Sequence, residues 1–98
     1  HRILTGYALI DTASSKCFSD VQTTNVTFKH ITRAFAEAYV NREDVLDFAG
    51  AYDHEHLGAI LIDRLDGDFY GSIGLPLSAI ASALKNEFEI DVVTLKSV

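Results

Sequence analysis

The sequence predicts a mixed α/β fold with the element order β-β-α-β-β-α-β, and three observations lead to this prediction. Two early segments, residues 3–10 and 18–28, are rich in strand-forming residues. Apolar side chains recur at helical spacing between Leu77 and Phe88. Between these regions, Asp66-Gly67 favours a tight hairpin turn. A chain of 98 residues makes at most one small domain, so residues 1–98 are expected to form a single domain or part of one.

The first half is expected to hold a pair of strands followed by a helix. Residues 3–10 form a mostly apolar strand, residues 11–16 a small polar loop, and residues 18–28 a second strand. Thr32 can accept an early backbone N–H and so begin a helix that runs to about Asn41. Residues 42–48 then form a charged connector with at most one short helical turn.

The second half is expected to hold a hairpin, a helix and a last strand. Residues 59–65 form the first strand of the hairpin, and Phe69, Tyr70 and Ile73 continue into the return strand. Pro76 suits the first position of the following helix. Residues 90–95 are predicted to form the final strand. The core-facing side chains of the last helix are Leu77, Ile80, Ala81, Leu84 and Phe88.

Composition excludes several classes of function. The net charge is −6 and the 8 basic residues are scattered singly, which argues against a nucleic-acid partner. No apolar run approaches the roughly 20 residues that a membrane-spanning helix needs. The single cysteine, Cys17, is expected to be a half-buried strand residue, and one unpaired cysteine suits the cytoplasm. Because the sequence contains no methionine, we expect it to be part of a longer polypeptide.

The candidate site is the stretch from Ala49 to Gly58. It holds two glycines, Tyr52 and four consecutive ionisable residues, Asp53-His54-Glu55-His56. The glycines allow the backbone to turn sharply or to approach a ligand closely. The two histidines are two residues apart rather than four, so the zinc motif HExxH is absent, and a solvated loop is the plainer interpretation than a metal site. Neither glycine-rich phosphate loop is present, and no serine lies in a nucleophile elbow.

Glu55 suggests recognition of a base. An ionised carboxylate accepts hydrogen bonds through two oxygens and donates none. The Watson–Crick edge of guanine offers two adjacent donors, whereas uracil and thymine present both a donor and an acceptor. Glu55 in a loop framed by glycines therefore fits a guanine-type base better than a pyrimidine.

Short motifs lie along nearly the whole chain: Leu4-Thr5-Gly6, Val26-Thr27-Phe28-Lys29-His30-Ile31-Thr32, Ala49-Gly50-Ala51-Tyr52, Leu57-Gly58 and Gly74-Leu75-Pro76-Leu77. In this combination and order they resemble the Maf family of nucleoside triphosphate pyrophosphatases. Members of this family are about twice as long, so the chain is similar to the C-terminal half of their Maf/ITPase-like fold.

The resemblance implies hydrolysis of a nucleoside triphosphate to a monophosphate and pyrophosphate. It places the catalytic and phosphate-binding residues in the other half of the family's fold, so no catalytic residue is assigned here. A divalent cation, Mg²⁺ or Mn²⁺, is the implied cofactor, and the implied partners are the nucleotide, the N-terminal half and a second copy in a homodimer. Thr5 lies in a family motif and is interpreted as structural.

The resemblance also bears on the base. Many members that act on dTTP and UTP have glutamine where this chain has Glu55, and a subgroup similar to 7-methyl-GTP pyrophosphatases has glutamate. We therefore expect 7-methyl-GTP or another modified nucleotide as substrate, with dTTP or UTP as the alternative. Tyr52, Asp53 and Glu55 are the expected substrate-binding residues. Two rival hypotheses remain open. In the first, this half of the fold only builds the core and the dimer contact; in the second, the chain is a stand-alone metal-binding module that uses His54 and His56.

Overall fold

The computed structural model describes residues 1–42 and 44–95, which fold as two compact units. The hairpin unit comprises Arg2–Thr24 and the described residues from Gly67 onward. The loop unit comprises His1 and Asn25–Asp66. The strands form one sheet with the order β1-β2-β3, and β2 contributes residues to both units. The predicted mixed α/β composition is confirmed.

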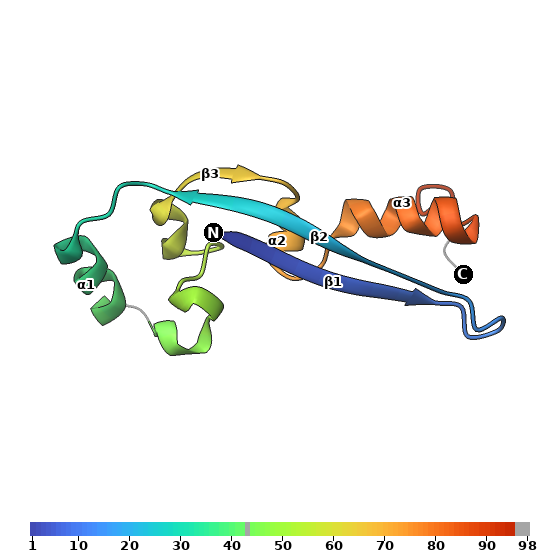
Figure 1. Ribbon diagram of the computed structural model, residues 1–98, viewed down its shortest axis with the longest axis horizontal. Coiled ribbons are helices and arrows are strands. Elements are labelled where there is room, and N and C mark those ends of the chain that lie inside the picture. Colours follow the sequence, from blue (N-terminus) through green and yellow to red (C-terminus); the bar gives the residue numbers. More distant parts are fainter. Residues whose placement is uncertain (43, 96–98) are drawn as a thin grey trace. The chain divides into compact units, whose positions relative to one another are not determined.

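In the hairpin unit, β1 (Arg2–Ile10) and β2 (Cys17–Phe28) run side by side in opposite directions (Figure 1). Alternate residues of β1 are half-buried and exposed, as expected for a strand with one covered face. The connecting loop closes on itself, because the Asp11 N–H donates to the Lys16 carbonyl at 2.9 Å. Cys17 lies in a strand as predicted, but it is exposed, because it begins β2 directly after this surface loop.

The predicted return strand after Asp66-Gly67 is wrong, because this segment forms the short helix α2 (Phe69–Ser72). Asp68 caps it, since its carboxylate accepts the Tyr70 N–H at 2.9 Å and so satisfies one free donor of the first turn. Gly67 adopts a φ of +133°, and a Cβ there would meet the backbone of Thr23 and Thr24 within 3.0 Å. The chain therefore leaves the sheet here instead of folding back along it.

Helix α3 (Leu77–Phe88) confirms the predicted helix, with Pro76 directly before its first residue. The predicted core-facing side is only partly correct, because Leu77 is exposed and the buried residue of α3 is Ala83. The other predicted core residues, Ile80, Ala81, Leu84 and Phe88, are half-buried. It ends where Glu89 adopts a left-handed conformation with a φ of 57°. The predicted final strand is wrong: the described residues 90–95 contain a turn instead. Asp91 holds this turn, because its side chain accepts the Val93 N–H at 3.0 Å and its carbonyl accepts the Thr94 N–H at 3.2 Å.

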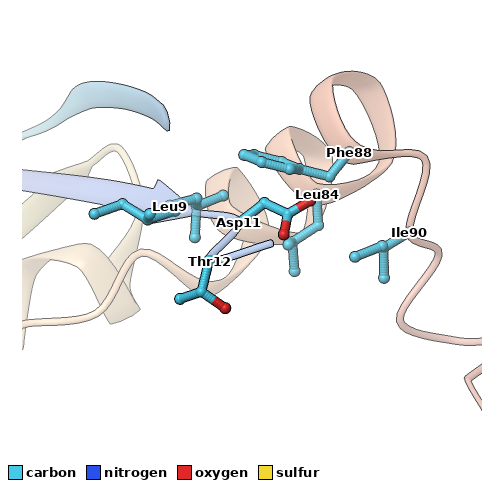
Figure 2. Close-up of a pocket in the computed structure, with 7 residues that line it drawn as sticks. Leu9, Asp11, Thr12, Leu84, Phe88 and Ile90 are labelled. Carbon is cyan, nitrogen blue, oxygen red and sulfur yellow. The ribbon is translucent and has the colours of Figure 1, made fainter. Parts of the chain in front are cut away.

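Thr5 ties β1 to α2, because its hydroxyl donates to the Gly71 carbonyl at 2.6 Å. This bond agrees with the structural interpretation of Thr5. The same unit has a hollow of about 340 Å³ between the end of β1 and α3, where Leu9, Leu84, Phe88 and Ile90 gather around Asp11 (Figure 2). Asp11 already accepts the Ala13 N–H at 2.9 Å, and this bond helps to hold the pKa of its carboxyl below the usual value. Its charge is thus stabilised within its own loop.

In the loop unit, β3 (Ile62–Asp66) pairs antiparallel with the end of β2. Val26 lies opposite Leu65, and the pairing register shifts between Thr27 and Phe28, near the end of β2. The predicted strand 59–65 is only partly correct. Its first residues belong to the 3-10 helix η3 (Leu57–Leu61), which begins with an Ala59 N–H bond to the His56 carbonyl at 3.0 Å.

Helix α1 (Arg33–Arg42) begins as predicted, since the Thr32 hydroxyl accepts the Phe35 N–H at 3.2 Å. The short 3-10 helix η1 (Val45–Asp47) follows, in agreement with the predicted short turn in the connector. A second 3-10 helix, η2 (Ala49–Ala51), opens the candidate loop and was not predicted. The core of this unit is small. Tyr39, Tyr52 and Leu61 are buried at its centre, and Ile31, Val45, Leu57 and Ile62 pack against them.

Candidate functional site

The candidate site lies wholly within the loop unit, and its backbone is set by the residues before Tyr52. Gly50 and Ala51 both adopt left-handed conformations, with φ of 72° and 60°. Glycine takes this conformation without strain, whereas alanine does so at a cost. Tyr52 then returns to an extended backbone with φ −152°. This reversal directs the Tyr52 ring into the core and the next four residues into a turn.

Tyr52 is an anchor of the site, with 7% of its surface exposed. Its hydroxyl shares a hydrogen bond of 2.9 Å with Nε2 of His1, and its ring meets the Phe28 ring edge-on at 4.9 Å between centroids. Burial, and secondarily the neighbouring Tyr39, raise the pKa of Tyr52, so its phenol stays protonated at neutral pH. The structure thus places this predicted substrate-binding residue in the core of the unit.

Asp53 organises the turn through its carboxylate. One oxygen, Oδ1, accepts the Glu55 N–H at 3.0 Å, and the other, Oδ2, contacts Nδ1 of His56. The hydrogen bond with His56, followed by the one from Glu55, lowers the pKa of Asp53. Only 19% of the Asp53 side chain is exposed, compared with 79% of the His56 side chain. Both oxygens of this predicted ligand residue are therefore engaged inside the turn.

Glu55 lies at the exposed part of the turn. Its backbone N–H is held by Asp53, while its carboxylate has no hydrogen-bond or ion-pair partner within residues 1–42 and 44–95. His54 is half-buried, and its ring centroid lies 5.9 Å from that of Tyr52. Of the three predicted substrate-binding residues, Glu55 is thus the one whose side chain is available to a ligand.

Two contacts to the backbone of Asp53 hold the turn in place. The Asp53 N–H donates to the Tyr39 hydroxyl at 3.4 Å. Gly58 packs directly against the turn, since a Cβ at this position would lie within 3.0 Å of three backbone atoms of Asp53. The close approach at the second glycine is thus to the backbone of the chain itself, and the predicted close approach to a ligand stays a prediction.

Sequence reasoning missed His1 and Tyr39 as supports of the site. His1 lies 51 residues from Tyr52, and spacing along the chain gives no signal for such a pair. Tyr39 is buried in the core of the unit, and its hydroxyl bond to the Asp53 N–H depends on the fold of a later loop. Both residues could be found only from the folded chain.

The described residues offer no ready metal site. Across residues 1–42 and 44–95, no group of three or more His, Cys, Asp or Glu side chains could hold a metal ion. His56 instead contacts Asp53, and His54 lies against Tyr52. The described residues therefore do not support the metal-binding module considered for His54 and His56, while the Mg²⁺ or Mn²⁺ that the resemblance implies stays a prediction.

A second hollow in the loop unit lies beside the start of α1 and measures about 310 Å³. Tyr52, Asp53 and Glu55 do not line it. The residues around the second hollow are Lys29, His30, Ile31, Thr32, Phe35 and Ile60.

In the part of the chain that the structure describes, no helix is long and apolar enough to cross a bilayer.

Comparisons with known proteins agree on one family. A family model described as Maf-like protein matches residues 1–87. A protein of Shouchella clausii named dTTP/UTP pyrophosphatase is 42% identical over 85 residues, which cover 87% of this chain and 44% of that protein. Proteins with the same name from Acetivibrio thermocellus and Alkaliphilus oremlandii are 38% and 32% identical over 88% and 94% of this chain. The chain spans about half the length of these relatives, since it covers 43% and 48% of the latter two.

Proposed function

Because this chain belongs to the Maf-like protein family, we propose that it is part of a nucleoside triphosphate pyrophosphatase. Such an enzyme adds water across the bond between the α- and β-phosphates and releases a nucleoside monophosphate and pyrophosphate. The observation that carries the proposal is the family match over residues 1–87. Relatives from three genera that are named dTTP/UTP pyrophosphatases favour dTTP and UTP as the substrates.

This chain would supply the base-facing part of the site, and the remainder of the polypeptide would supply the phosphate contacts. The net charge of −6 and the scattered basic residues make this chain a poor partner for a triphosphate by itself. We therefore expect residues 1–98 alone to be inactive. A divalent cation, Mg²⁺ or Mn²⁺, is part of this proposal, since such ions are usually held by one or two carboxylates together with the phosphates of the nucleotide.

Glu55 supports 7-methyl-GTP as a second candidate substrate. Its exposed carboxylate can accept two hydrogen bonds from a guanine-type edge, but only one from the N3–H of uracil or thymine. The names of the relatives favour the pyrimidine nucleotides, so the expectation of 7-methyl-GTP is now the alternative. A homodimer and a cytoplasmic location, where nucleoside triphosphates are abundant, complete the proposal.

The test is pyrophosphate release by the full-length natural polypeptide, assayed with Mg²⁺ or Mn²⁺ against UTP, dTTP, GTP and 7-methyl-GTP. We expect release from UTP and dTTP. Preference for 7-methyl-GTP would support the pyrophosphatase activity but contradict the expected preference for pyrimidine nucleotides. No release from any nucleotide would contradict the proposed function.

The variant Glu55→Gln tests the base contact. We expect it to change the ratio of kcat/KM between pyrimidine and guanine nucleotides by about tenfold, the effect of one hydrogen bond to a charged group. Asp63→Asn is the matched control, since Asp63 is an exposed carboxylate on β3 outside the turn. An unchanged ratio in Glu55→Gln would show that Glu55 does not read the base.

A further inference from the structure

The two carboxylates of the 53–56 turn lie in different surroundings. The Asp53 carboxylate is mostly covered and engages the Glu55 N–H through one oxygen and the His56 ring through the other. The Glu55 carboxylate is exposed and has no partner among the residues that the structure describes. A side chain whose oxygens are both engaged inside a turn holds that turn, and an exposed one without partners can meet a ligand.

The backbone of Asp53, like its side chain, is held by hydrogen bonds and close packing. Its N–H donates to the buried Tyr39, and its carbonyl accepts the His56 N–H at 3.4 Å. Gly58 lies so close behind it that no side chain fits there. The turn is thus tied at its first residue to the core, and at its last residue to Asp53 itself.

Selectivity between bases depends on the direction of the group that reads them. An error of about 1 Å in the position of such a group can reduce a rate by about a hundredfold. Glu55 has no side-chain contact of its own to fix its direction within the described chain, so its direction depends on its backbone. That backbone is held by the Asp53 bond to the Glu55 N–H.

We propose that Asp53 and His56 are positioning residues that hold the 53–56 turn and thereby aim the Glu55 carboxylate at the base of the nucleotide. This inference rests on the proposed pyrophosphatase function. Asp53 acts through the Glu55 N–H, and His56 acts by holding the second oxygen of Asp53. Neither residue touches the nucleotide in this arrangement, which replaces the expectation that Asp53 contacts the substrate.

The test compares Asp53→Ala, Asp53→Asn and His56→Ala with the control Asp63→Ala in the full-length polypeptide. Asp53→Ala is expected to lower the selectivity between UTP and 7-methyl-GTP about tenfold, through KM more than through kcat. Asp53→Asn keeps an oxygen that can accept the Glu55 N–H and should recover part of the selectivity. Equal selectivity in wild type and Asp53→Ala would overturn the proposal.

A double-mutant cycle separates positioning from general damage. If Asp53 acts through Glu55, Asp53→Ala should have no further effect on selectivity when Glu55 is already alanine. Additive effects of the two substitutions would overturn the proposal, because they would give Asp53 an independent role.

Amide hydrogen exchange at Glu55 gives a readout that does not depend on activity. Asp53→Ala should raise the exchange rate of the Glu55 N–H at least tenfold, and Asp63→Ala should leave it unchanged. An unchanged rate in Asp53→Ala would overturn the positioning role. If the wild type releases no pyrophosphate, the proposed pyrophosphatase function is contradicted, and so is the role of Asp53 in nucleotide selectivity. The exchange rate of the Glu55 N–H still shows in that case whether Asp53 holds the turn.

Discussion

At the scale of single residues, Asp53 and His56 link the chemistry of the turn to pH. The hydrogen bond from His56 is the largest cause of the lowered pKa of Asp53, and the Glu55 N–H is the next. A carboxyl whose pKa is lowered by folding stabilises the folded state above its unfolded pKa of about 3.9. That contribution is lost as the pH falls through the lower folded pKa. The turn should therefore be held at neutral pH and released only in strong acid.

We predict that His56→Ala raises the pKa of Asp53 toward its usual value, leaving only the smaller effect of the Glu55 N–H. The measurement is an NMR titration of the Asp53 carboxyl carbon. Asp11 is an internal control, because its lowered pKa depends mainly on the Ala13 N–H in the other unit. A midpoint for Asp53 that does not change in His56→Ala would contradict this assignment of cause.

Gly58 gives the second prediction at this scale. Gly58→Ala should lower the free energy of unfolding by about 1–3 kcal/mol, because the added Cβ would overlap the backbone of Asp53. Denaturant unfolding monitored by tyrosine fluorescence measures this loss. Gly6→Ala is the matched control, since a Cβ at Gly6 meets nothing within 4 Å. Equal stability of the two variants would argue against the close approach at Gly58.

At the scale of elements, local signals predicted the helices better than the strands. Thr32 and the apolar stripe of Leu77–Phe88 act within a few residues, so the sequence alone indicated both α1 and α3. The apolar run near Phe69 was interpreted as a strand because its composition favours one, but capping by Asp68 and the φ of Gly67 produced a helix. Composition thus failed where a single side chain redirected the backbone.

This explanation predicts the effect of removing the cap of α2. Asp68→Ala should destabilise the protein by about 1 kcal/mol, since the Tyr70 N–H loses its acceptor. Asp68→Asn should retain most of the stability, because asparagine caps helices about as well. Thermal unfolding followed by circular dichroism compares the two variants. A larger loss in Asp68→Asn than in Asp68→Ala would contradict the capping role.

At the scale of the whole molecule, the family could be identified from the sequence, whereas the supports of the site could not. The ordered motifs lie within the residues that the family model matches. The pairing of His1 with Tyr52 and of Tyr39 with Asp53 depends on contacts between distant segments. The expectation that residues 1–98 are part of one larger domain stays a prediction, and the chain spans about half the length of its relatives.

One feature of the turn bears on how such proteins diverge. Glu55 contributes its backbone N–H to the turn, whereas its carboxylate supports no neighbour in the described part of the chain. Most changes of function cost stability, because the altered residue also holds the fold together. If Glu55 reads the base as proposed, position 55 is exempt from that conflict, and a single substitution there would change the preferred nucleotide of a lineage while the scaffold stays intact.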